Sequence, residues 1–152
     1  MSGHNIAEQL RQSLDQYTDV NTGVPITISF DFRGAANDAD LELEQVPLFI
    51  ADRAYELEYA VARWTANEST NNDLTIGISK VASGTAISGT HTAMTSTSWD
   101  VTTGNNTSTT LTPKTDGSEN LAVGDSLILK HSDSGGTTEL QGLFGTIRLR
   151  AI

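Results

Sequence analysis

The sequence contains no cysteine and few basic residues, and both shortages narrow the possible functions. Without cysteine there is no disulfide framework, no thiol nucleophile and no cysteine-based zinc site. Lys and Arg number 9 against 19 Asp and Glu, which gives a net charge of −10. Because so acidic a surface repels phosphates, we expect no direct nucleic-acid partner.

Long apolar runs are also missing. No stretch approaches the roughly 20 apolar residues that a membrane-spanning helix needs. The first ten residues lack the basic segment followed by an apolar segment that is typical of a secretory signal. We therefore expect a protein without a membrane partner and without an N-terminal secretory signal.

The chain is rich instead in hydroxyl groups and turn-forming residues. Thr, Ser and Gly fill 48 of the 152 positions. Such a composition favours short strands and turns over helices. A length of 152 residues suits one domain with a sizeable core.

One helix is predicted, over residues 5–17. Asn5 is a suitable N-cap, and Glu8 follows three residues later at the spacing of a capping box. A helix of this length is marginal alone in water, so it needs a surface to lie on, either its own domain or a partner or sister subunit. We assign residues 1–23 to an N-terminal arm. Its apolar stripe, our candidate partner-binding site, consists of Ile6, Leu10, Leu14 and Tyr17.

From residue 24 onward the apolar period changes to two, which is typical of strands. The alternation is clearest in residues 24–33, and further strands are predicted at residues 41–44, 46–50, 54–64, 74–80, 125–131 and 137–152. Pro47 predicts either that its strand lies at the edge of a sheet or that the strand begins at this residue. In residues 54–64 one face is predicted to carry Tyr55, Leu57, Tyr59 and Val61.

Residues 85–115 contain 16 Ser or Thr and predict short exposed strands and loops. Their sparse apolar anchors are Met94, Trp99, Val101 and Leu111. Strands thus recur along the chain without intervening helices. We therefore predict an all-β fold in which residues 24–152 form a jelly-roll-like β-sandwich, preceded by the short N-terminal helix or arm.

No catalytic, cofactor-binding or metal-binding residues stand out. His4, His91 and His131 have no second histidine or acid at a metal-binding helical spacing. Residues 133–136 (DSGG) resemble the nucleophile segment of chymotrypsin-like proteases, but a hairpin turn is the favoured interpretation. The alternating acids of residues 38–44 could attract Ca²⁺, although a solvated face is favoured. We expect no enzymatic activity, no cofactor and no metal.

Two tryptophans raise the possibility of sugar binding. Trp64 and Trp99 could serve as stacking platforms in a lectin-like sandwich. Large aromatic residues at such positions more often belong to a core or an interface, which is the favoured interpretation here.

Three segments together resemble a known family. Residues 46–55 (VPLFIADRAY), 74–87 (ending SGTAI) and 121–127 (LAVGDSL) are similar in order and spacing to small capsid decoration (cement) proteins of tailed phages and related virion structural proteins. The likeness covers roughly residues 46–152. Asp52 and Tyr55 depart from the family pattern, which has Pro and a small residue there.

The resemblance implies a structural protein on the outer capsid surface of a virion that is assembled in the host cytoplasm. Its implied partners are the major capsid protein and itself, as a homotrimer that stabilises the icosahedral head. The arm is then the candidate capsid-gripping or subunit-linking element. The alternative is a glycan- or receptor-binding β-sandwich module of a phage fibre or tail, which would use Trp99 and the Thr-rich loops.

Overall fold

The computed structural model describes residues 23, 25–31, 45–64, 66–68, 75–101, 107–132 and 139–152. Every regular element in these ranges is a β-strand, and all strand pairs are antiparallel. Nothing in them is a helix that could cross a membrane. The predicted arm and its helix at residues 5–17 lie outside the described residues, apart from Gly23, and stay predictions.

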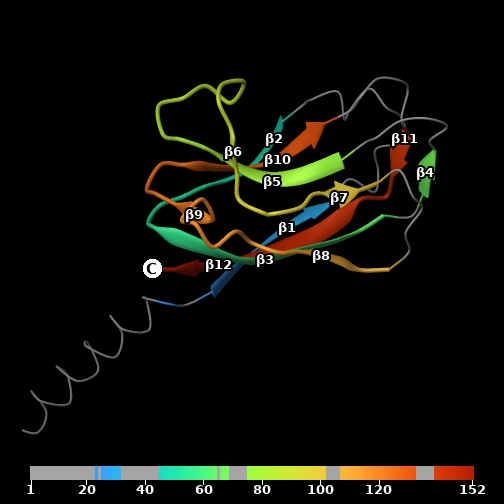
Figure 1. Ribbon diagram of the computed structural model, residues 1–152, viewed down its shortest axis with the longest axis horizontal. Helices are drawn as coiled ribbons and strands as arrows, with labels where there is room; N and C mark the ends of the chain where they lie inside the picture. Colours follow the sequence, from blue (N-terminus) through green and yellow to red (C-terminus); the bar gives the residue numbers. More distant parts are fainter. Residues whose placement is uncertain are drawn as a thin grey trace, which may run out of the picture.

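The strands form two larger sheets and one short ribbon (Figure 1). The first, here the β12 sheet, has the order β1 (Pro25–Asp31), β12 (Phe144–Ala151), β3 (Tyr55–Arg63) and β8 (Thr109–Leu111), with β9 (Asn120–Leu121) also paired with β3. The second, here the β10 sheet, has the order β2 (Gln45–Ile50), β10 (Ser126–Ser132), β5 (Thr75–Val81) and β6 (Thr92–Ala93), with β7 (Trp99–Asp100) also paired with β5. The ribbon consists of β4 (Ala66–Glu68) and β11 (Glu139–Gln141).

The chain passes repeatedly from one sheet to the other. β1, β3, β8, β9 and β12 belong to the β12 sheet, whereas β2, β5, β6, β7 and β10 belong to the β10 sheet. This alternation between two facing antiparallel sheets is the strand order of a jelly roll. The predicted all-β sandwich is confirmed.

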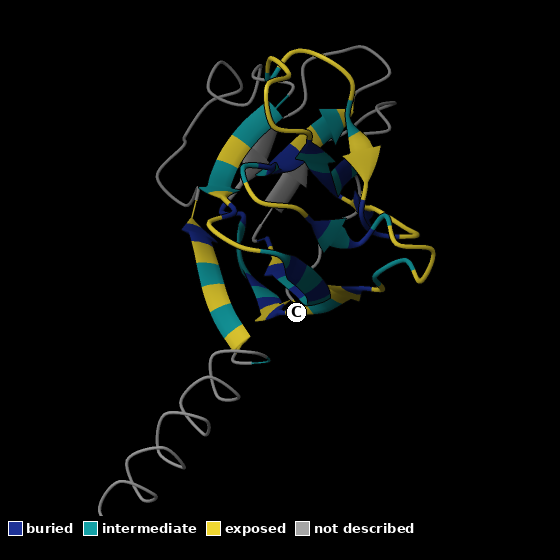
Figure 2. Ribbon diagram, turned by 90° about the vertical axis from the view of Figure 1, so that its left-hand side faces the viewer, coloured by how far each residue is buried: buried dark blue, intermediate teal, exposed yellow. Residues whose placement is uncertain are grey.

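The core lies between the two sheets, where Figure 2 shows the buried residues. Trp99 connects the sheets, because its ring lies 6.0 Å from that of Phe30 in β1 and its Nε1 donates a hydrogen bond to the Thr109 carbonyl at 2.9 Å. The anchors predicted for the hydroxyl-rich region are all buried in this core: Met94, Trp99, Val101 and Leu111. Each such side chain contributes roughly 1.5–3 kcal/mol by leaving water.

The prediction of which β3 side chains face the core is wrong for the second half of the strand. Tyr59 and Val61, expected beside Tyr55 and Leu57, are only half-buried. The side chains of β3 that face the core are Tyr55, Leu57, Ala60 and Ala62. The cause is a β-bulge at Glu58, where the pairing with β12 shifts between Arg148 and Leu149. One extra residue moves every later side chain of the strand to the opposite face.

β2 lies at the edge of the β10 sheet, as Pro47 predicted. Within the described residues its partner strand is β10 alone. Their ladder shifts register between Leu127, opposite Phe49, and Ile128, opposite Pro47. A proline cannot donate to a ladder, so an edge with a bulge accommodates it.

The last predicted strand is interrupted. β11 ends at Gln141 and β12 begins at Phe144, and between them Gly142 has a φ of 69°. This left-handed conformation favours glycine and redirects the chain from the ribbon into the β12 sheet.

The described chain begins and ends at the same end of the sandwich. The Gly23 amide donates to the Ala151 carbonyl at 2.8 Å, and Pro25 pairs with Arg150. The Ile152 amide donates to the Ala54 carbonyl at 3.2 Å. The predicted arm is therefore attached beside the C-terminal strand.

Candidate functional site

The residues predicted to bind a partner lie outside the described part of the chain; they are Ile6, Leu10, Leu14 and Tyr17. Their point of attachment is described, because Gly23 is bonded to the end of β12. The predicted arm leads into the domain at Gly23, so we looked for a contact surface around Gly23 and the end of β12.

The three segments that carry the family resemblance meet at this end. The Ala51 amide donates to the Asp125 carbonyl at 2.9 Å, and the Gly124 amide donates to the Ala51 carbonyl at 2.7 Å. The Asp125 carboxylate accepts from the Ser83 amide at 3.1 Å and from the Ala122 amide at 2.9 Å. We call this cluster, made of residues 51–55, 83–85 and 121–125, the Asp125 junction.

Asp125 is the buried centre of the junction, with 8% of its surface exposed. Its two carboxylate oxygens bond to amides of different segments, which replaces the water lost on burial. Hydrogen bonds to a charged group contribute about 1.5–3 kcal/mol each. One side chain therefore holds the loop after β5 to the turn before β10.

Glycine is required at position 124. Its φ is 85°, and a Cβ atom there would lie 2.7 Å from the Ser83 hydroxyl oxygen. The close approach lets the turn before β10 lie directly against the loop after β5. Any side chain would be strained in this conformation and would push the two segments apart.

Asp52 and Tyr55, the two departures from the family pattern, bond to each other. The Tyr55 hydroxyl donates to Asp52 Oδ1 at 2.6 Å, and the buried Tyr55 ring meets Phe49 edge-on at 5.5 Å. This hydrogen bond lowers the pKa of Asp52 below its ordinary value. Burial raises the pKa of the Tyr55 hydroxyl, and the bond to Asp52 raises it further. Asp52 and Tyr55 thus form one local unit that fixes the start of β3.

Three large hydrophobic side chains are exposed next to the junction. Ile50, Val123 and Ile152 are 68%, 65% and 54% exposed. Ile50 precedes Ala51, Val123 lies in the turn before Asp125, and the Ile152 amide is bonded to Ala54. Exposed apolar side chains held on an ordered backbone are suited to contact with another protein. These three side chains are therefore candidates for contact with another protein.

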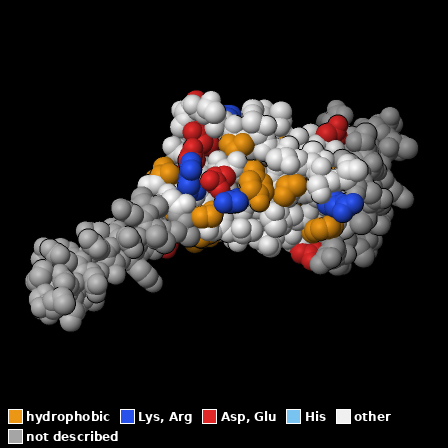
Figure 3. Space-filling view, turned by 90° about the horizontal axis from the view of Figure 1, so that it is seen from below, with side chains coloured by type: hydrophobic (Ala, Val, Ile, Leu, Met, Phe, Trp, Pro, Cys, Tyr) orange, Lys and Arg blue, Asp and Glu red, His pale blue; other side chains and the backbone are white. Residues whose placement is uncertain are grey.

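The outer face of the β12 sheet carries ion pairs near the same end (Figure 3). Arg148 lies 2.7 Å from Glu58, and Arg150 lies 2.6 Å from Glu56 and 3.6 Å from Glu58. The hydrogen bond that Arg150 donates to the Glu56 carboxylate raises the pKa of Arg150. All four side chains are partly exposed, so these pairs contribute little to stability.

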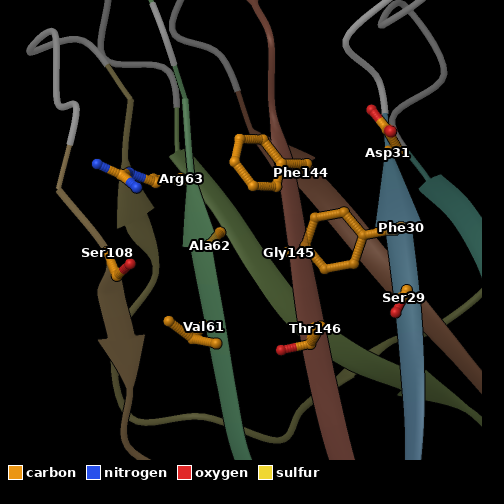
Figure 4. A pocket seen from close by; sticks show the side chains of 10 residues that line it. All are labelled: Ser29, Phe30, Asp31, Val61, Ala62, Arg63, Ser108, Phe144, Gly145 and Thr146. Carbon is orange, nitrogen blue, oxygen red and sulfur yellow. The ribbon is translucent and has the colours of Figure 1, made fainter.

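A groove of about 350 Å³ lies farther along this sheet (Figure 4). The Phe30 ring lies beside Gly145, where no side chain fills the space. The described residues that line it include one carboxylate, of Asp31, one cation, of Arg63, and no histidine. The described residues that line it also contribute the hydroxyl groups of Ser29, Ser108 and Thr146.

The remaining sequence candidates do not converge on a site. His91 Nε2 lies 2.6 Å from the Ile87 carbonyl within its own loop. No group of three or more His, Cys, Asp or Glu that could hold a metal occurs among the described residues. The acidic residues 38–44 and the DSGG run at 133–136 lie outside them.

Neither tryptophan is available for stacking on a sugar. Trp64 is 1% exposed and Trp99 is fully buried. The favoured interpretation, that both tryptophans belong to the core, is confirmed. Neither indole ring is exposed as the stacking surface that the glycan-binding alternative would use.

Sequence reasoning did not single out Asp125, although it lies within one of the resembling segments. Its signal, an aspartate after a turn glycine and before an apolar strand, is common to many β-turns. Only the fold reveals that its carboxylate bridges two distant segments. Comparisons of the chain with protein-family models, curated proteins and solved structures gave no significant match.

Proposed function

We propose that this protein is a virion structural protein that decorates and stabilises an icosahedral phage capsid. It binds across subunits of the major capsid protein on the outer capsid surface, as a symmetric oligomer and specifically a homotrimer. The observation that carries the proposal is the Asp125 junction. Three segments that resemble decoration proteins, distant in the sequence, form one hydrogen-bonded unit around a buried carboxylate.

The junction suits this role because it presents a preformed contact surface. Ile50, Val123 and Ile152 project from it beside the attachment point of the arm. A surface that is already ordered loses little conformational entropy on binding. In a symmetric oligomer several such contacts form together, and avidity then multiplies their modest individual strength.

The direct test is co-sedimentation with expanded phage heads that lack their decoration protein, preceded by light scattering of the free protein. We expect a trimer that pellets with the heads at saturable stoichiometry. A monomer that stays in the supernatant at all concentrations contradicts the proposal. Binding to a glycan array without binding to heads would favour the fibre or tail alternative.

Two variants locate the contact. Deletion of residues 1–22 removes the arm, and Ile50→Ser with Val123→Ser removes apolar side chains of the junction. We expect each to weaken pelleting at least tenfold if its surface grips the head. The matched control is Val61→Ser, a similar change on the outer face of the β12 sheet, which we expect to pellet normally. Equal loss in the control and in both variants would mean that the contact lies elsewhere.

A further inference from the structure

A hollow of about 290 Å³, which we call the Lys130 hollow, lies on the outer face of the β10 sheet. It is lined by residues 75, 77–79, 93, 95, 98, 130 and 132. In β5 the side chains of Ile76 and Ile78 belong to the core. Because side chains alternate along a strand, Thr75, Gly77 and Ser79 lie on the opposite face, away from the other sheet.

The charge of the hollow comes from β10. Leu129 belongs to the core, so the next residue, Lys130, lies on the outer face, directly opposite Gly77 of β5. Among the described residues that line the hollow, Lys130 is the one charged residue. It is exposed, and its ammonium group makes no ion pair or hydrogen bond with the described part of the chain. The ammonium group is therefore available to an anion.

Hydroxyl groups surround this single cation. Two of them belong to buried residues, since Ser79 is 4% exposed and Thr95 is 5% exposed. The Thr95 hydroxyl donates to the Thr97 carbonyl at 2.7 Å, which leaves its oxygen as an acceptor. The hydroxyl-bearing residues that line the hollow are Thr75, Ser79, Thr95, Ser98 and Ser132.

The Ser79 hydroxyl is the most informative of these groups. Within the described residues it has no hydrogen-bond partner, although buried polar groups normally have one. Leaving such a group without a partner is costly. A buried hydroxyl at the wall of a hollow is therefore suited to bond with a ligand that enters it.

Gly77 brings a further hydroxyl beside Lys130. A Cβ atom at Gly77 would lie 2.9 Å from the Ser98 hydroxyl oxygen. The Ser98 hydroxyl thus occupies the place where any other residue at position 77 would carry its side chain. Because Lys130 lies opposite Gly77, a cation and a hydroxyl flank the same position of the sheet.

The charge and the hydroxyls together define the kind of ligand. One cation matches one negative charge, and a chain with a net charge of −10 repels a multiply charged anion such as phosphate more strongly than a single carboxylate. Hydroxyl groups both donate and accept, so they complement a ligand that carries hydroxyl groups itself. The volume lies near the lower end of ligand pockets, which run from about 300 to 1,000 Å³, and suits one sugar-sized molecule.

We propose that the Lys130 hollow binds a sugar acid, a small molecule with one carboxylate and several hydroxyl groups. The Lys130 ammonium group pairs with the carboxylate, and the hydroxyls of Ser79 and Ser98 bond to the hydroxyls of the ligand. The site needs no exposed tryptophan. It does not depend on the proposed capsid role and is tested on the purified protein alone.

NMR titration of the isotope-labelled full-length protein tests the ligand class. Glucuronate should shift the backbone amide signals of Gly77, Ser79, Ser98 and Lys130 in a saturable way. Glucose lacks the carboxylate and acetate lacks the hydroxyls, so each should bind at least tenfold more weakly. Inorganic phosphate should also bind more weakly than glucuronate. The proposal is overturned if glucuronate leaves these signals unchanged, or if any of the other three probes binds as tightly.

Two variants test the assigned residues. Lys130→Gln should weaken glucuronate binding roughly tenfold or more, because a hydrogen bond to a charged group is lost. Ser79→Ala removes the buried hydroxyl and should weaken binding severalfold.

Two matched controls make the same changes outside the hollow. Lys114→Gln removes a cation that does not line it, and Ser126→Ala removes a hydroxyl from the same strand as Lys130. Both should bind glucuronate like the wild type. Urea unfolding of all four variants confirms that they are folded. A loss in either control equal to that in its matched variant would contradict the assignment.

Discussion

The carboxylate of Asp125 accepts a hydrogen bond from the backbone amide of Ser83, 42 residues earlier in the chain, at 3.1 Å. Its other oxygen bonds to the Ala122 amide within its own turn. Asp125 thus fixes both the shape of a turn and the position of a separate loop against it. One side chain therefore makes both a hydrogen bond within its own turn and a hydrogen bond to a distant segment of the chain.

Asp125→Ala should destabilise the domain by about 1–3 kcal/mol, because two amides lose their acceptor in a poorly hydrated place. Urea unfolding measures this change. The matched control is Asp116→Ala, which removes an exposed carboxylate that accepts from the Ser118 amide at 2.9 Å. Water replaces that acceptor, so the loss should be clearly smaller. Equal losses would show that burial of Asp125 adds nothing.

Gly145→Ala should destabilise the β12 sheet by about 1–3 kcal/mol or more. The added Cβ would collide with the Val61 carbonyl and lie 2.7 Å from Phe30 Cζ. The double variant with Phe30→Leu separates the two obstacles. Since the carbonyl belongs to the backbone, we expect little recovery in thermal unfolding, and full recovery would identify the Phe30 ring as the main obstacle.

Tyr55→Phe should change the pH dependence of stability at both extremes. Asp52 has a lowered pKa in the folded state, so its contribution is present above the unfolded pKa and is lost as pH falls through the folded value. Tyr55 has a raised pKa, so its contribution is present below about pH 10 and is lost as pH rises through the folded value. The difference in unfolding free energy between wild type and Tyr55→Phe should therefore be level near neutral pH. It should shrink below about pH 4 and above about pH 10; a difference independent of pH would contradict the coupling.

Tryptophan fluorescence should report two buried indole rings. Trp64 and Trp99 are 1% and 0% exposed, and they are the two tryptophans of the chain. We expect native emission at short wavelength and acrylamide quenching severalfold weaker than in urea. Added oligosaccharides should leave the emission unchanged. A glycan-dependent shift would reopen the question of sugar stacking.

Local alternation predicted most strands because each half-buried strand carries its own period of two. β1 follows this rule throughout its described residues, and β5 follows it from Thr75 to Ile78. Tyr59 does not, because the bulge at Glu58 arises from pairing with β12, which lies more than 80 residues later. The alternation within one strand cannot reveal that this strand has one residue more than the strand with which it pairs.

The candidate site was less accessible to sequence reasoning. The three resembling segments could be named, but their meeting point depends on the jelly-roll connections. Asp125 differs from other turn aspartates only in what the fold places around it. The stripe from Ile6 to Tyr17 lies outside the described residues and stays a prediction.

The pairing of β1 with β12 determines how the domain responds to mechanical load. Pro25 opposes Arg150, so the first and last described residues lie at the same end of one antiparallel ladder. Because the hydrogen bonds of this ladder run perpendicular to its strands, tension between those two ends breaks them one after another, as in unzipping. Tension applied along the strands from opposite ends would instead shear many bonds at once. The described domain therefore resists a load along its strands far better than a load that pulls Pro25 and Arg150 apart.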